Sequence, residues 1–281
     1  MTEFRPSRFE ILPTIIKNLL IINVLFFLAQ KTFTGPSAVF SFEDSLALHA
    51  WQSPLFRPWQ LITHMFLHGD FGHIFGNMFA LWMFGAVLEN LWGSKRFLIF
   101  YIICGLGAAL IHLLFLSYEF IPLMKGYENL VRLHANGGVA FNRAMIQFIS
   151  DNKIEFTERA SLLDALRTAD TDSAGLSNQV FRVLSTYYTN TVNTATLGAS
   201  GAVFGVLAAF IYLFPNTYIY IYFLLPVKAK WLGLLYFGYE LFFALQNSAG
   251  DNVARWAHIG GAIVGLLIVM TWNKTNKKSF Y

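Results

Sequence analysis

Ser200 and His258 stand out in this sequence because each opens an apolar segment rich in small residues. Ser200 lies in LGASGAVFG at 197–205, and His258 lies in AHIGGAIVG at 257–265. A serine hydroxyl is a weak nucleophile until a neighbouring base takes its proton, and histidine is the usual base near neutral pH. If the two segments meet, the pair can form a hydrogen bond and carry out nucleophilic catalysis.

A third stretch, HGDFGHIFGN at 68–77, adds His73 and Asn77. The two residues are one helical turn apart, so a helix presents both on the same face. The tetrahedral intermediate of acyl transfer carries an oxyanion, which needs hydrogen-bond donors that are already in place. We expect His73 and Asn77 to provide these donors, together with the backbone N–H of Ser200.

The pattern predicts a Ser-His dyad rather than a triad, because no Asp or Glu lies close in sequence to His258. The Gly-x-Ser-x-Gly motif of soluble hydrolases is not satisfied either, since residue 202 is Ala. A single serine among Gly and Ala residues is most often helix-packing filler. The site hypothesis therefore depends on the joint occurrence of serine, histidine and donors at one depth.

A metal site is the other chemistry to consider, because His64, His68 and His73 are closely spaced. The segment has no His-Glu-x-x-His motif, and its one carboxylate is Asp70. We therefore expect no metal ion and no cofactor.

The segments that carry these residues are apolar enough to enter a membrane. The chain of 281 residues is 56% hydrophobic and 13% charged, whereas a soluble domain has about 25% charged residues. A spanning helix needs about 20 apolar residues. Six segments approach this length, at about 11–30, 73–92, 97–118, 197–214, 229–245 and 256–272. The fifth competes with the apolar stretch 217–227 for one span. We predict an all-α, polytopic bundle of six transmembrane helices.

Residues 119–190 interrupt this pattern with the charge content of a soluble protein. Their periodicity favours two or three short helices. We therefore divide a single domain of residues 1–281 into three parts. Residues 1–118 hold the first three spans and an interfacial loop, 119–190 form a polar extracytoplasmic insert between the third and fourth spans, and 191–281 hold the last three spans and a cytoplasmic tail.

The distribution of positive charge predicts the orientation of the spans. Half of the 20 Lys and Arg residues fall in short segments on the side that holds both termini. The second, fourth and sixth spans then all begin on the opposite side, which brings the four polar side chains to one depth. Small residues at Gly198, Gly201, Gly261 and Gly265 would let these helices approach closely.

This charge pattern favours an integral, multi-pass protein of a bacterial cytoplasmic membrane, with cytoplasmic N- and C-termini. Its partners would include membrane lipid. No basic stripe suggests a nucleic acid, and nothing in the sequence indicates an oligomeric state.

In this order, the motifs resemble those of the rhomboid family of intramembrane serine proteases. The resemblance rests on PWQLITHMFLHGDFGHIFGN, GASGAVFG and AHIGGAIVG, and it covers roughly 51–116 and 196–272. It implies a six-helix bundle with a pocket that opens outward. Ser200 would be the nucleophile and His258 the general base, with His73 and Asn77 as oxyanion donors.

The resemblance also implies roles for two further parts of the chain. His68 matches a structural position of the second-span motif, and the loop 246–255 matches a cap that moves to admit substrate. Two features depart from the family pattern. Phe204 stands where many members have a tyrosine that stacks on the catalytic histidine, and the insert at 119–190 has no counterpart in the minimal fold.

The resemblance implies an endopeptidase that cleaves single-pass transmembrane proteins through an acyl-enzyme at Ser200. Helix-breaking residues are expected near the cut, because a helix hides its peptide carbonyls. Two alternatives remain. One is a non-catalytic rhomboid-like protein that binds membrane clients. The other is a channel or transporter, which the scarcity of charges inside the spans, apart from Glu240, disfavours.

Overall fold

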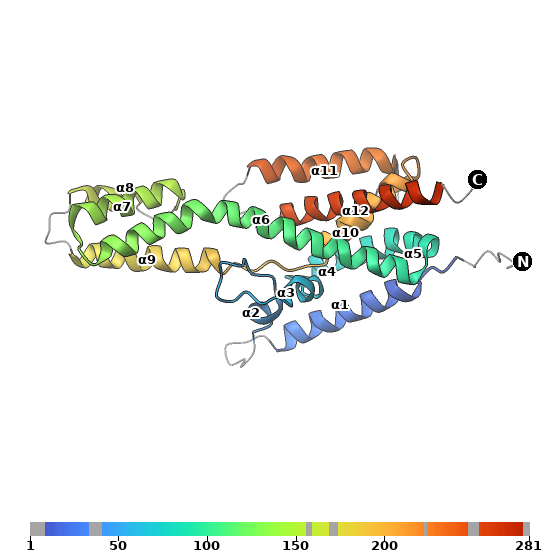
Figure 1. Cartoon of the computed structure of the whole chain (residues 1–281), viewed down its shortest axis with the longest axis horizontal. Coiled ribbons are helices and arrows are strands. Elements are labelled where there is room, and N and C mark those ends of the chain that lie inside the picture. The colour runs from blue at the N-terminus through green and yellow to red at the C-terminus, as the bar shows by residue number, and fades with distance from the viewer. Residues whose placement is uncertain are drawn as a thin grey trace, which may run out of the picture. The chain divides into compact units, whose positions relative to one another are not determined.

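The computed structural model describes residues 9–33, 41–155, 159–168, 174–221, 224–246 and 253–277. The described chain is mostly helical, as predicted, with one short β-hairpin (Figure 1). It divides into two compact units. Unit 1 comprises Met1–His49, Leu55–Leu114 and Ala195–Tyr281, and unit 2 comprises Ala50–Pro54 and Phe115–Thr194.

Unit 1 contains the apolar helices. These are α1 (Thr14–Thr32), α4 (Phe71–Ala80), the π-helical turn η2 (Leu81–Gly85), α5 (Ala86–Trp92), the first half of α6 (Ser94–His134), α10 (Ser200–Leu213), α11 (Ala229–Gln246) and α12 (Arg255–Lys277). Four described helices are long and apolar enough to cross a membrane, at Thr14–Thr32, Phe71–Trp92, Ser94–His134 and Arg255–Asn273. The chain is thus a multi-pass membrane protein, and the number of six spans stays a prediction.

Of the two stretches that compete for the fifth predicted span, 229–245 forms a helix, α11, and its place as a span stays a prediction. The stretch before it forms an antiparallel hairpin of β1 (Tyr218–Ile221) and β2 (Leu225–Lys228), in which Tyr218 faces Lys228. Alternating Tyr and Ile residues favour a strand over a helix. The helix therefore starts only at Ala229 and then runs beside α12 (Figure 1).

Glu89, in α5, caps the start of α1 with hydrogen bonds. A helix leaves its first N–H groups without intrahelical acceptors, and the residue before α1, Pro13, provides no side-chain cap. The buried Glu89 carboxylate accepts from the backbone N–H groups of Ile15 and Ile16, each at 2.9 Å, and from the Ser94 hydroxyl at 2.6 Å. One side chain thereby joins three helices of unit 1.

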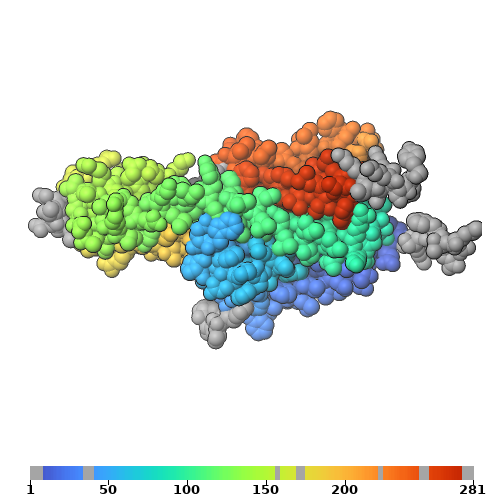
Figure 2. All heavy atoms as spheres, in the orientation of Figure 1, coloured from blue at the N-terminus to red at the C-terminus, as the bar shows by residue number. Residues whose placement is uncertain are grey.

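Helices α10 and α12 pack with their backbones in direct contact. Gly201 and Gly205 of α10 face Gly261 and Gly265 of α12, and a Cβ on Gly261 would overlap the Gly201 carbonyl. On its other side α12 packs against α6, where Val264 lies against Gly107. Figure 2 shows the side chains of α12, in red, directly beside those of α6, in green. This packing fixes the depth at which α10 and α12 begin.

The connection between α1 and α4 folds into the short helices α2 (Phe42–Leu46), α3 (Gln60–Thr63) and η1 (His64–Phe66). It supports the segment that leads into α10. Leu48 and Thr196 exchange two backbone hydrogen bonds of 2.8 Å, and the Gly198 N–H donates to the His64 carbonyl at 2.9 Å. Backbone hydrogen bonds therefore fix the segment that leads into Ser200.

Unit 2 contains the second half of α6 with α7 (Gly138–Asp151), α8 (Arg159–Thr168) and α9 (Ala174–Val192). Helix α6 does not end near residue 118, where the apolar segment ends. It continues through Pro122 to His134, and two glycines with positive φ, Gly137 at +60° and Gly138 at +74°, follow its end. Aromatic stacking of Tyr127 on Tyr188, with ring centroids 3.9 Å apart, joins α6 to α9.

Candidate functional site

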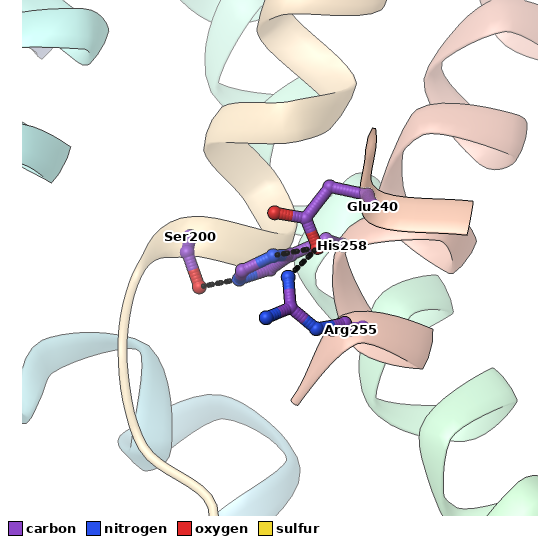
Figure 3. A network of polar contacts seen from close by, with 4 residues as sticks. All are labelled: Ser200, Glu240, Arg255 and His258. Atoms are coloured by element: carbon purple, nitrogen blue, oxygen red, sulfur yellow. Dashed lines mark hydrogen bonds and ion pairs between the residues drawn. The ribbon is translucent and has the colours of Figure 1, made fainter. Parts of the chain in front are cut away.

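Ser200 and His258 meet at the start of two adjacent helices. Ser200 is the first residue of α10, and His258 lies in the first turn of α12. The His258 Nε2 and the Ser200 Oγ are 2.8 Å apart, which is a hydrogen-bond distance (Figure 3). The hydrogen bond expected from the sequence is therefore present. Because Ser200 opens its helix, the backbone N–H groups of the first turn have no intrahelical acceptors and point toward the same end.

Phe204 fixes the plane of the His258 ring. It lies one turn after Ser200, and its ring stacks on the imidazole with centroids 4.2 Å apart and planes at 10°. On α11, the Tyr236 ring stacks on Phe204 at 5.1 Å. An aromatic ring without a hydroxyl is thus sufficient to pack the histidine.

A carboxylate that is distant in sequence also contacts His258. The Glu240 Oε2, from α11, lies 3.2 Å from the His258 Nδ1 and 3.3 Å from Nη1 of Arg255 (Figure 3). The prediction of a dyad did not include this contact. It considered neighbours in sequence, whereas Glu240 belongs to the preceding antiparallel helix. The available signal was the presence of a charged residue inside an apolar run.

His73 lies close to Gly198, two residues before Ser200. The N-cap Asp70 accepts from the His73 N–H at 2.9 Å and so fixes the start of α4. A Cβ on Gly198 would come within 2.7 Å of the His73 Nε2, and Gly198 has a φ of +129°. Only glycine suits both the backbone conformation and the close approach of the histidine ring.

Asn77 is buried one turn after His73, and the residue is 7% exposed. Within the described part of the chain, its Nδ2 has no hydrogen-bond acceptor. A buried donor without a partner costs about 1–3 kcal/mol and needs an explanation. A donor kept free for an oxyanion would explain it.

Two histidines that precede α4 are held neutral. Burial lowers the pKa of His64 to about 4, although its Nδ1 lies 2.7 Å from the Gln60 carbonyl. Burial and the nearby His73 lower the pKa of His68 to about 4. The rings of His68 and His73 meet edge to face at 5.0 Å. Among the described residues, no group of three or more His, Cys, Asp or Glu side chains could hold a metal ion.

The remaining site prediction concerns the loop 246–255. Residues 247–252 of this loop lie outside the described residues, so its role as a cap stays a prediction. The described geometry brings a serine hydroxyl and an imidazole together at the starts of α10 and α12, with His73 of α4 close to Gly198. This is the arrangement that acyl transfer requires.

Comparison with known proteins gives this arrangement a family context. The model of the Rhomboid domain matches residues 56–126 and 168–274. RHOMBOID-like protein 12, mitochondrial, of Arabidopsis thaliana is 26% identical over 78% of this chain and 47% of its own length. An uncharacterized mitochondrial rhomboid protein of Schizosaccharomyces pombe is 27% identical over 75% and 49%. The chain therefore spans about half the length of these two relatives. Rhomboid protease GluP of Bacillus subtilis is 35% identical over 21% of this chain and 12% of its own length.

These comparisons contradict one expectation from the sequence. The names of the relatives from Arabidopsis thaliana and Schizosaccharomyces pombe place those proteins in mitochondria, not in a bacterial cytoplasmic membrane. The distribution of Lys and Arg indicates on which side of a membrane a loop lies. It carries no information about which membrane that is.

Proposed function

Because this chain belongs to the rhomboid family, we propose that it is an intramembrane serine endopeptidase with Ser200 as nucleophile and His258 as general base. The observation that carries this proposal is the 2.8 Å hydrogen bond between the two side chains at the start of α10. The backbone contact of α10 with α12 keeps this pair together. A protein that only binds membrane clients needs no such pair.

In the proposed reaction, His258 removes the proton from the Ser200 hydroxyl while the oxygen attacks the carbonyl carbon of a peptide bond. The resulting oxyanion is stabilised by His73, by Asn77 and by the backbone N–H of Ser200. The protonated His258 then gives its proton to the leaving amine, and the bond to nitrogen breaks. Water, deprotonated by His258, hydrolyses the acyl-enzyme and regenerates Ser200.

The proposal also covers the membrane, the substrate and the topology. We place the protein in a mitochondrial membrane, because the relatives from Arabidopsis thaliana and Schizosaccharomyces pombe carry that location in their names. In this membrane it would have the six spans predicted above. Its substrates would be single-pass transmembrane proteins with helix-breaking residues near the cut, since a peptide carbonyl must leave its helical hydrogen bond before it can be attacked.

A reconstitution experiment tests the proposal. The full chain, purified in detergent and returned to vesicles, is mixed with a single-pass substrate that carries Gly and Pro near the outer end of its helix. We expect cleavage, its inhibition by a fluorophosphonate, and a single fluorophosphonate adduct on Ser200 in the mass spectrum. A substrate with an uninterrupted Leu helix should be cut more slowly. Absence of both cleavage and the adduct would leave client binding as the function.

Asn77 offers a more specific prediction. Replacing Asn77 by Ala should lower kcat by about 10²–10³-fold, the usual effect of losing one oxyanion donor. The melting temperature should stay unchanged or rise, because the variant removes a buried donor without a partner in the described structure. The matched control is Asn142→Ala, which removes a buried amide whose Oδ1 accepts from the Ser177 hydroxyl at 2.7 Å. This control should lose stability and keep its kcat. A parallel loss of kcat and stability in Asn77→Ala would contradict the assignment.

A further inference from the structure

Glu240 is a buried carboxylate without a role in the reaction proposed above. We propose that Glu240 is a positioning residue that orients His258, so that the site works as a Ser200–His258–Glu240 triad whose charge is balanced by Arg255. This inference rests on the proposed function. It concerns how the histidine is held, not whether Ser200 is the nucleophile.

The first argument is the geometry at the two ring nitrogens of His258. Its Nε2 lies 2.8 Å from the Ser200 Oγ and its Nδ1 lies 3.2 Å from the Glu240 Oε2 (Figure 3). An ionised carboxylate can only accept a hydrogen bond, so it selects the tautomer in which Nδ1 carries the proton. The Nε2 lone pair is then free to accept the serine proton. This is the role of the third member of a catalytic triad.

The second argument is that stacking on Phe204 cannot by itself fix the orientation of the His258 ring. Phe204 fixes the plane of the imidazole, with ring planes 10° apart. However, a ring that turns over by 180° about its bond to Cβ keeps the same plane and exchanges the positions of nitrogen and carbon. Stacking barely distinguishes these two states, whereas a hydrogen bond at Nδ1 does. Glu240 therefore selects between the two ring orientations that stacking on Phe204 leaves open.

The third argument is the electrostatic balance of the site. The side chain of Glu240 is 5% exposed, and an unpaired charge in this environment would be strongly unfavourable. The Arg255 Nη1 lies 3.3 Å from the same carboxylate oxygen. The guanidinium is itself held over the rings of Tyr239 and Phe243, at 5.4 and 5.1 Å. When His258 takes the serine proton, the carboxylate also stabilises the new imidazolium.

An ion pair that merely ties α11 to α12 is the competing explanation. It would also account for the Glu240–Arg255 contact. It predicts that replacing both charged side chains by neutral ones of similar size restores kcat together with the melting temperature. The positioning role predicts that kcat stays low even when the melting temperature recovers, because no neutral side chain replaces the charge at Nδ1. The two explanations therefore differ in kcat once folding is restored.

The test uses three variants of the full chain in vesicles, with the substrate described above. Glu240→Gln should lower kcat by at least about 10²-fold while KM changes less than about threefold, since the amide can select the wrong tautomer. Glu240→Asp, which keeps the carboxylate, should recover part of this loss. Glu240→Gln combined with Arg255→Met removes the cation that would otherwise face a neutral amide. It should recover the melting temperature without recovering kcat.

The outcomes separate this inference from the proposed function. A folded Glu240→Gln variant with wild-type kcat would overturn the positioning role and leave Ser200 and His258 as a dyad. Recovery of kcat in the double variant would likewise reduce Glu240 to a structural ion pair. If instead the wild-type protein neither cleaves nor forms the Ser200 adduct, the proposed function itself fails. Rates are compared per mole of folded protein, so a loss of folding cannot imitate a loss of positioning.

Discussion

Replacement of Ser200 by Ala, or of His258 by Ala, is expected to lower kcat by about 10⁴-fold or more in the vesicle assay. The two side chains share one hydrogen bond of 2.8 Å, so each is ineffective without the other. Losing the nucleophile removes the acyl-enzyme, and losing the base leaves a hydroxyl that is hardly ionised near neutral pH. For the same reason, the double variant should be about as slow as either single variant.

Two controls match these substitutions in residue type. Ser185→Ala removes a hydroxyl that donates to the Phe181 carbonyl in α9. His112→Ala removes a buried imidazole that is hydrogen-bonded to Thr196 at 2.8 Å and not to Ser200. Both should keep kcat within about tenfold, although His112→Ala should lower the melting temperature, because a buried hydrogen bond is lost. Equal cleavage by wild type and Ser200→Ala would show that the hydrolysis comes from elsewhere.

Replacement of Gly261 by Val is expected to have the largest effect on stability. Even the Cβ of an alanine at this position would overlap the Gly201 carbonyl, and backbone cannot move aside as a side chain can. Overpacking a core typically costs about 1–3 kcal/mol, and a clash with backbone should reach or exceed the top of this range. We expect a marked fall in the melting temperature in detergent, or failure to yield folded protein. Any variant that does fold should have lost the Ser200–His258 hydrogen bond and the fluorophosphonate adduct with it.

The matched control is a glycine on the exposed side of α11. At Gly238, no heavy atom of the described structure lies within 4 Å of the position that a Cβ would take. Gly238→Ala should therefore leave the melting temperature unchanged or raise it slightly, because alanine has the higher helix propensity. If Gly261→Val melts like wild type, then α10 and α12 do not pack through their backbones in the membrane.

Local sequence motifs predict part of the candidate site. The sequence singles out Ser200, His258, His73 and Asn77, because each occurs in a short motif near the start of an apolar segment. The structure brings Ser200 and His258 into hydrogen-bond contact, and the catalytic roles of all four residues stay a prediction. The backbone contact between α10 and α12 was indicated by Gly261 and Gly265, since small residues on one helical face favour close packing. The membrane could not be predicted, because positive charge reports sidedness only.

The sequence by itself determined the chemistry that is available and the helices that carry it, because apolar length and small-residue spacing act locally along the chain. Only the tertiary structure decided which charged group reaches His258. Glu240 is 18 residues away in sequence, yet the antiparallel pairing of α11 and α12 brings its Oε2 to 3.2 Å from Nδ1. Such a contact depends on the depth and rotation of α11 relative to α12, and the sequence around Glu240 indicates neither.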